Sequence, residues 1–237
     1  MKYFLFYIAL IVPFILTACG GEPPKESSGS PQPVAPAAPA APAGPKESLP
    51  KIIAFGDSLT AGFGLPAEAS YPSLLQEKLN RDGFKYEVVN AGVSGDTSAG
   101  GLARIDWTLE GDVRVVVLEL GANDILRGQS IPAMKKNLGD IIERAKARGA
   151  EVVLAGMEAP TNMGIQYRRA VHDAYKSLAR EHDVPLIPFF LDRVAGVESL
   201  NQPDRIHPNA EGTKIVAETV YKFLKPALEI QNRPNAS

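Results

Sequence analysis

The sequence predicts a three-layer α/β sandwich built around one parallel β-sheet. From residue 51 to residue 228, short runs of apolar, mostly β-branched residues alternate with amphipathic stretches. The apolar runs are nearly continuous, as in parallel strands that helices cover on both faces. The chain has 237 residues, of which 45% are hydrophobic, so one domain of this kind buries an ample core. This alternation favours right-handed crossovers between neighbouring parallel strands.

Five apolar runs are predicted to form the strands. They cover residues 52–55, 86–89, 115–120, 152–155 and 185–187. Apolar residues recur at helical spacing between and after them, in the stretches 71–79, 134–145, 171–178 and 215–224. Gly83 and Gly149 follow the first two helical stretches as C-terminal stops, and Ser130 precedes the second as an N-cap. We see one folded domain and no internal repeat.

The N-terminus resembles the signal of bacterial lipoproteins. Lys2 precedes an apolar run over residues 3–16, which is too short to cross a membrane as a helix. Small residues lie just before Cys19, the only cysteine of the chain. The resemblance implies that residues 1–18 are removed and that Cys19 carries lipid, with Gly20 favouring the periplasmic side of an outer membrane. An ordinary signal peptide or an uncut membrane anchor is the alternative.

Composition divides the rest of the chain. Residues 19–50 are rich in Pro and Ala and bury too little surface to offset ordering entropy, so we expect a disordered linker. The folded domain is predicted over residues 51–228, followed by a tail over 229–237. The net charge of -2 argues against nucleic acid as a partner, because such binding needs a basic surface. We expect a monomer.

Polar and small residues gather where four of the predicted strands end. In open parallel sheets, ligands bind beyond the carboxyl ends of the strands, so these segments are expected to meet at one edge. They are Gly56-Asp57-Ser58-Leu59 after the first strand, residues 90–96 after the second, Gly121-Ala122-Asn123-Asp124 after the third and Asp204-Arg205-Ile206-His207 after the fifth.

Serine, histidine and aspartate at this edge suit nucleophilic catalysis. A serine hydroxyl such as that of Ser58 needs a base within hydrogen-bond reach. His207 follows Asp204 by three residues, so a turn lets the carboxylate accept the Nδ1 proton and leaves Nε2 for the serine. The other histidines, His172 and His182, fall in a charged helical stretch and are interpreted as solvated helix residues.

Acyl transfer also needs donors for a developing oxyanion. The backbone N–H groups of Gly95 and Ser58 and the side-chain amide of Asn123 are the candidates. Each has a simpler interpretation on its own, since glycine and asparagine are ordinary turn residues. No metal is needed for this chemistry, and Asp96 and Glu158 do not form a ligand cluster by their spacing.

The four polar segments, taken in order, resemble the four sequence blocks of the SGNH (GDSL) hydrolases. Residues 88–91, 94–98 and 185–190 are similar to the bacterial thioesterase I, lysophospholipase and arylesterase branch. The resemblance implies a flavodoxin-like sheet in order 2-1-3-4-5 and a serine hydrolase that cleaves small-molecule esters or thioesters without a cofactor. It assigns Ser58 as nucleophile, Asp204 and His207 as its partners, and Gly95 and Asn123 to the oxyanion hole.

Two other functions remain open at this point. The same fold and site serve carbohydrate O-deacetylases, which prefer acetyl groups, and a lipoprotein that only binds a ligand is a non-enzymatic alternative. We further expect Asp57 and Asp124 to hold turns and Trp107 to be packed. The loop over residues 156–164 is either a mobile lip over an acyl chain or a packed connection.

Overall fold

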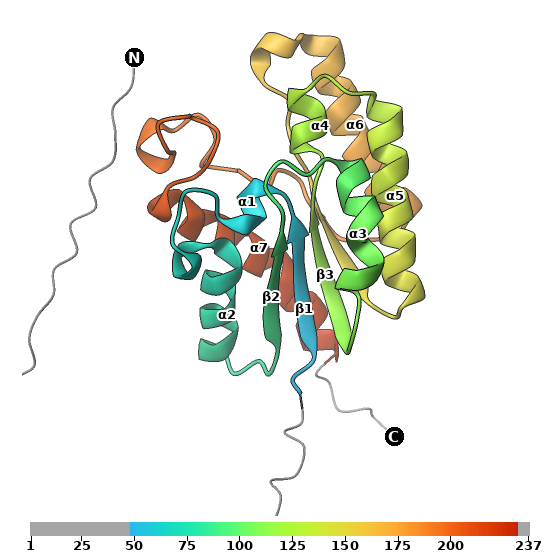
Figure 1. Cartoon of the computed structure of the whole chain (residues 1–237), viewed down its shortest axis with the longest axis vertical. Coiled ribbons are helices and arrows are strands. Elements are labelled where there is room, and N and C mark those ends of the chain that lie inside the picture. The colour runs from blue at the N-terminus through green and yellow to red at the C-terminus, as the bar shows by residue number, and fades with distance from the viewer. Residues whose placement is uncertain (1–47, 232–237) are drawn as a thin grey trace, which may run out of the picture. The chain divides into compact units, whose positions relative to one another are not determined.

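A computed structural model describes residues 48–231 of the chain (Figure 1). Five parallel strands form one sheet in the order β2-β1-β3-β4-β5, which confirms the expected order. The strands are β1 (Lys51–Gly56), β2 (Glu87–Gly92), β3 (Val113–Glu119), β4 (Glu151–Ala155) and β5 (Leu186–Ile187). Each expected run thus contains a strand, but the bounds differ by up to three residues: β2 continues to Gly92, β3 begins at Val113 and ends at Glu119, and β5 excludes Pro185.

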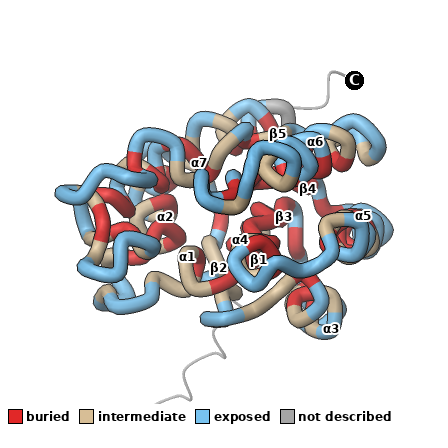
Figure 2. The backbone as a smooth tube through the Cα atoms, turned by 90° about the horizontal axis from the view of Figure 1, so that it is seen from above, coloured by how far each residue is buried: buried red, intermediate tan, exposed pale blue. Residues whose placement is uncertain are grey.

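The described residues contain seven α-helices, of which five cover the two faces of this sheet and two, α1 and α4, are short helices after β1 and β3. In the view from above, α2 and α7 lie on one face and α3, α5 and α6 on the other (Figure 2). The helices are α1 (Ser58–Ala61), α2 (Tyr71–Arg81), α3 (Ser98–Thr108), α4 (Ala122–Leu126), α5 (Ile131–Ala147), α6 (Ile165–Glu181) and α7 (Ala210–Gln231). Three short 3-10 turns cover Ala67–Ala69, Thr161–Met163 and Glu198–Leu200.

The core lies on both sides of the central strands β1 and β3. Residues 52–55 of β1 and residues 115–118 of β3 are almost completely buried. Because they are covered on both faces, their sequences are continuously apolar rather than alternating. The register pairs Gly56 with Gly92 of β2 and with Glu119 of β3. The three strands therefore end side by side, and the segments that follow them begin at one edge.

Helix α3 was not predicted. Its sequence contains Gly100 and Gly101, which lower helix propensity. The structure explains Gly101, because a Cβ there would collide with Leu120 beyond β3, so the glycine lets the helix approach the sheet. Thr97 caps the helix by accepting a hydrogen bond from the Gly100 N–H. Trp107, expected to be packed, is 79% exposed at the last turn, and that expectation is wrong.

Helix α5 starts and ends as expected. The Ser130 hydroxyl oxygen accepts a hydrogen bond from the Ala133 N–H at 3.4 Å, and Gly149 follows the helix with a φ of 80°. None of the helices within residues 48–231 is long and apolar enough to span a membrane.

Candidate active site

Ser58 lies at the first residue of α1, directly after β1. Asp57 caps this short helix, and its Oδ1 accepts a hydrogen bond from the Leu59 N–H at 3.0 Å. The chain thus turns sharply from a buried strand into a helix, and the serine is presented at the turn. Because α1 begins at Ser58, the backbone N–H of this residue lies at the positive end of a helical turn.

The structure brings His207 to Ser58 across 149 residues of sequence. The imidazole Nε2 lies 2.9 Å from the serine Oγ, and Nδ1 lies 2.7 Å from Asp204 Oδ2. An Nδ1–H that donates to the carboxylate leaves Nε2 as an acceptor for the serine hydroxyl. The sequence predicted this arrangement from Asp204 and His207 being three residues apart.

A tight turn holds this aspartate and histidine together. Oδ1 of Asp204 accepts hydrogen bonds from the backbone N–H groups of Ile206 and His207, both at 3.0 Å. Arg205 between them has a φ of 59°, the left-handed conformation that closes the turn. The hydrogen bond from the His207 ring, followed by those from the two backbone N–H groups, lowers the pKa of Asp204 to about 2. The carboxylate is therefore ionised at neutral pH.

Gln202 and Phe63 hold the loop that contains His207 in place. Gln202 donates from Nε2 to the Phe63 carbonyl at 2.7 Å, and its backbone N–H donates to the His207 carbonyl at 2.8 Å. The ring of Phe63 lies 4.7 Å from the imidazole of His207, centre to centre. Phe63, which follows α1, is 50% exposed. It shields one side of the imidazole, and nothing in the sequence analysis identified it.

Two buried carboxyl groups, those of Asp57 and Glu119, lie on the core side of Ser58, and each residue is 0% exposed. Burial raises the pKa of Asp57 to about 6, although hydrogen bonds from the Leu59 N–H and the Asn123 amide act in the opposite direction. Burial, reinforced by the charge of Asp57, raises the pKa of Glu119 well above the ordinary carboxyl value. The sequence analysis missed Glu119 because it lies within the apolar run over residues 115–120.

Asn123 lies between the segments after β1 and β2. Its Nδ2 donates to Asp57 Oδ2 and to the Asp96 carbonyl, both at 3.0 Å. These two acceptors fix the amide beside the turn of Ser58 and the loop that contains Gly95. Both amide protons are committed in this state, so binding of an oxyanion requires one of them to be shared or released.

Gly95 adopts a φ of 85°, which favours glycine, and its carbonyl accepts a hydrogen bond from Arg127 at 3.0 Å. Within residues 48–231, no acceptor is recorded for the backbone N–H of Gly95 or of Ser58. The two N–H groups and the Asn123 amide, all expected at an oxyanion hole, are thus brought to one edge of the sheet.

One arginine ties the ends of the first two strands together. Arg104 on α3 donates to Asp96 Oδ2 at 2.6 Å, to the Ala91 carbonyl and to the Gly56 carbonyl, both at 2.9 Å. Its guanidinium also lies 4.1 Å from the centre of the Phe55 ring. Asp96, considered as a possible metal ligand, is therefore paired with an arginine.

Asp124 connects two elements rather than only its own turn. Its carboxylate accepts hydrogen bonds from the Ser98 backbone N–H at 2.7 Å and the Ser98 hydroxyl at 2.6 Å. The start of α3 is thereby fixed to α4. Among the described residues, no group of three or more His, Cys, Asp or Glu side chains is arranged to hold a metal ion.

A cleft of about 480 Å³ opens beside Ser58, with Leu59 in its wall. Its lining is mostly apolar and comes from the segments after several strands and from α6: Leu59, Ala122, Ile125, Leu126, Met157, Glu158, Ala159, Pro160, Thr161, Arg168, Phe189, Leu191, Ala195, Gly196, Arg205 and Ile206. Residues 157–161 contribute one wall, so the loop over 156–164 overhangs the site as expected. Met157 and Ala159 are buried, which shows that this loop is also packed against the core.

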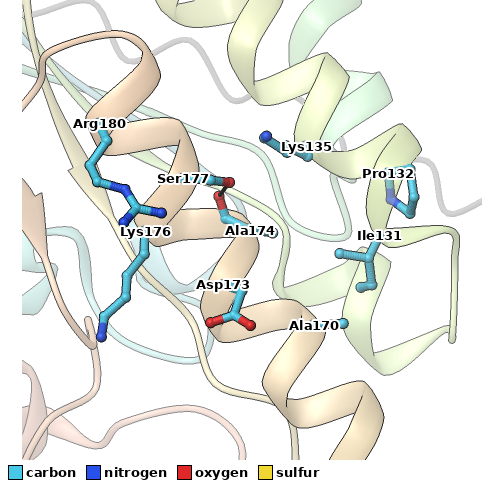
Figure 3. Close-up of a pocket in the computed structure, with 9 residues that line it drawn as sticks. All are labelled: Ile131, Pro132, Lys135, Ala170, Asp173, Ala174, Lys176, Ser177 and Arg180. Carbon is cyan, nitrogen blue, oxygen red and sulfur yellow. Dashed lines mark hydrogen bonds between the residues drawn. The ribbon is translucent and has the colours of Figure 1, made fainter.

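A second and larger hollow, of about 700 Å³, lies between α5 and α6 (Figure 3). It is shallow and mixed in charge, with Lys135 and Asp173 on its walls. None of the residues that line it belongs to the segments at Ser58. The candidate site is therefore the smaller, apolar cleft.

The other two histidines do not approach Ser58. His172 is exposed on α6, as predicted. His182 caps the end of α6 and its side chain is 17% exposed, so it is only partly solvated. It packs near Gly139 of α5, because a Cβ at that glycine would lie 3.0 Å from His182 Nε2.

Comparisons with known proteins agree with this geometry. The model of the "GDSL-like Lipase/Acylhydrolase family" matches residues 54–215. "Esterase TesA" of Pseudomonas aeruginosa is 42% identical over 178 residues, which are 75% of this chain and 89% of the relative. The Escherichia coli protein named "Thioesterase 1/protease 1/lysophospholipase L1" is 40% identical over 176 residues, 74% of this chain and 83% of the relative.

Solved structures show the same similarity. A crystal structure of TesA has a TM-score of 0.73 and 41% identity, and the match covers 75% of this chain and 99% of that one. The psychrotrophic esterase EstA from Pseudoalteromonas, solved with monoethylphosphonate as inhibitor, has a TM-score of 0.72 and 32% identity, covering 76% and 98%. The chain thus belongs to the GDSL-like lipase/acylhydrolase family and is a hydrolase of carboxylic esters or thioesters.

Proposed function

We propose that Ser58 is the nucleophile of this hydrolase and forms an acyl-enzyme. The observation that carries the proposal is the continuous line of hydrogen bonds from Asp204 through His207 to the Ser58 hydroxyl. His207 Nε2 takes the serine proton as Oγ attacks the substrate carbonyl, and the resulting imidazolium is stabilised by ionised Asp204. The imidazolium then protonates the leaving alcohol or thiol. Water repeats the sequence on the acyl-enzyme and frees Ser58.

The oxyanion of each tetrahedral intermediate is assigned to three donors. These are the backbone N–H groups of Ser58 and Gly95 and the side-chain amide of Asn123. The position of Asn123 between Asp57 and Asp96 supports this role, because it holds the amide beside both loops. The amide exchanges one of its present acceptors for the oxyanion, and one such donor typically contributes about 2.7–4 kcal/mol to lowering the barrier.

We assign the acyl group of the substrate to the apolar cleft. A cleft of about 480 Å³ lined by side chains such as Leu126, Met157 and Ile206 favours acyl chains longer than acetyl. The relatives are named esterase, thioesterase and lysophospholipase, and these names fit substrates with such chains.

Ser58→Ala tests the nucleophile. We expect this variant to lose turnover of p-nitrophenyl butyrate and covalent labelling by a fluorophosphonate, while its circular dichroism and unfolding midpoint stay close to those of the wild type. Trp107→Ala is the matched control, because that side chain is exposed and lies on α3. Labelling or turnover retained by Ser58→Ala overturns the assignment. A series of esters from acetyl to decanoyl tests the cleft, and a preference for acetyl contradicts it.

We further propose that lipid on Cys19 anchors the mature protein to a membrane. The favoured location is the periplasmic side of an outer membrane. Support comes from the sequence alone, since Cys19 and the segments over 1–18 and 19–47 lie outside the described residues. The mass of the mature N-terminal peptide and the fractionation of wild type and Cys19→Ser test the proposal. A wild-type mass without lipid contradicts it.

A further inference from the structure

The side chain of Glu119 contacts the turn over residues 57–60, which contains Ser58, from the core side. It is the last residue of β3, and its side chain is fully buried. Oε2 accepts a hydrogen bond from the Asp57 backbone N–H at 3.3 Å and another from the Thr60 hydroxyl at 2.7 Å. Asp57 precedes Ser58 and Thr60 follows it by two residues. One carboxyl oxygen therefore holds both flanks of the nucleophile.

The backbone around this carboxyl group is shaped to admit it. A Cβ at Gly56 would collide with Glu119 Oε2 and with Thr60 Oγ1. The glycine that begins the Gly56-Asp57-Ser58-Leu59 segment thus leaves space for the acid. The four-residue helix α1 is too short to be stable without such support.

The geometry also indicates which of the two buried carboxyl groups is charged. Asp57 has two donors, the Leu59 N–H and the Asn123 amide, that favour its ionised form. Glu119 Oε1 has no hydrogen-bond partner within residues 48–231. Burying a charged carboxylate oxygen without a hydrogen-bond partner costs far more free energy than burying a neutral one. Two adjacent carboxyl groups also resist being ionised together. Glu119 is therefore the neutral member of the pair.

We propose that Glu119 is a positioning residue for the hydrolase reaction: as a neutral acid it fixes the turn over residues 57–60 so that the Ser58 hydroxyl meets His207. It acts through Asp57 and Thr60 and does not touch the substrate. The proposal rests on the assigned role of Ser58, but its test is separate, because Ser58→Ala decides that role independently.

Two substitutions in the full chain separate positioning from simple filling of the core. Glu119→Gln keeps a neutral acceptor oxygen of the same reach, whereas Glu119→Met keeps a similar volume but has no comparable acceptor. We expect the kcat of Glu119→Gln for p-nitrophenyl butyrate to stay within about 3-fold of the wild type. We expect the kcat of Glu119→Met to fall by about 10- to 100-fold with KM little changed, since a displaced nucleophile costs rate rather than affinity. The rate of fluorophosphonate labelling should fall in parallel.

Rates are compared per folded enzyme, with unfolding midpoints measured for each variant. A kcat of Glu119→Met equal to that of the wild type, or an equal loss of kcat in the glutamine and methionine variants, overturns the proposal. If Glu119→Met does not fold, Thr60→Val removes one of the two donors with little change in shape. We expect that variant to lose about 5-fold in kcat at constant KM, and an unchanged kcat overturns the proposal on its own.

Discussion

Asp57 and Asp204 both serve the same serine, yet their surroundings are opposite. Asp57 is fully buried, and burial raises its pKa to about 6. The side chain of Asp204 is 38% exposed, and hydrogen bonds from the His207 ring and from two backbone N–H groups lower its pKa to about 2. One side of the site is thus built into the core, whereas the other is a surface loop held by local hydrogen bonds.

This difference separates stability from activity. The buried side depends on strand packing, so changes there are expected to affect both folding and the position of Ser58. The exposed side depends on a turn over residues 204–207 and on Gln202. Changes there should affect the rate with little effect on the free energy of unfolding. Each prediction below tests one side of this comparison.

The largest effect is expected for Asp204→Asn on the exposed side. An amide does not hold the Nδ1–H tautomer as a carboxylate does, and such a change typically lowers kcat by about 10⁴-fold. We expect the urea midpoint to shift little. Ester hydrolysis and urea denaturation measure the two quantities, with Asp173→Asn, exposed on α6 and away from Ser58, as control. A large loss of stability in Asp204→Asn would contradict the separation of the two sides.

Asn123→Ala is expected to lower kcat by about 10²- to 10³-fold, because one oxyanion donor is lost. The KM should change by much less, since the interaction strengthens only when charge develops on the carbonyl oxygen. Steady-state kinetics with p-nitrophenyl butyrate measure both constants, and Gln129→Ala, close by in the chain, is the control. A loss confined to KM would remove Asn123 from the oxyanion hole.

The pH dependence of stability should identify Asp57. Its folded-state pKa is raised to about 6 from 3.8, so the stability that its protonated form contributes is fully present below about pH 3.8 and is lost as the pH rises through about 6. We expect Asp57→Asn to show a smaller decline in the free energy of unfolding between pH 4 and 7 than the wild type. Urea titrations at several pH values measure this. Parallel curves for the two proteins would show that Asp57 is not the group responsible.

The smallest effect is expected for Gln202→Ala. The variant loses two hydrogen bonds from Gln202 Nε2, one to the Phe63 carbonyl and one to the Pro208 carbonyl. Only the first of them links the loop that contains His207 to the segment after α1. Since one such bond contributes about 1 kcal/mol, kcat/KM should fall by about 5-fold. A loss as large as that of Asp204→Asn would mean that this contact, and not the turn at Asp204, positions His207.

The sequence predicted the parts of the site that depend on strand ends. Ser58, Asn123 and His207 follow apolar runs or a recognisable turn, and parallel strands bring such segments together whatever the details of packing. The sheet order followed from the family resemblance, and the positions of the strands, though not their bounds, followed from continuous apolar runs. Local pattern was sufficient for the strands and the turn, whereas the sheet order required the resemblance.

Glu119 and Arg104 were missed because their partners are remote in sequence. Glu119 lies 59 residues from Thr60, and Arg104 lies 48 residues from Gly56. The signal for Glu119 was an acidic residue in a run otherwise expected to be fully buried, where a carboxyl group requires a partner. Arg104 gave no such signal. It lies in α3, which was not predicted because its glycines lower the helix propensity.

Arg104 has a consequence for redesign of this enzyme. One guanidinium joins the ends of β1 and β2 to the loop of Gly95, and a lysine at this position offers too few donors in fixed directions to replace it. Residues 157–161, which line the apolar cleft, make none of these contacts with Arg104. Substrate preference is therefore best altered by replacing residues 157–161, while Arg104 and the residues that it binds are kept.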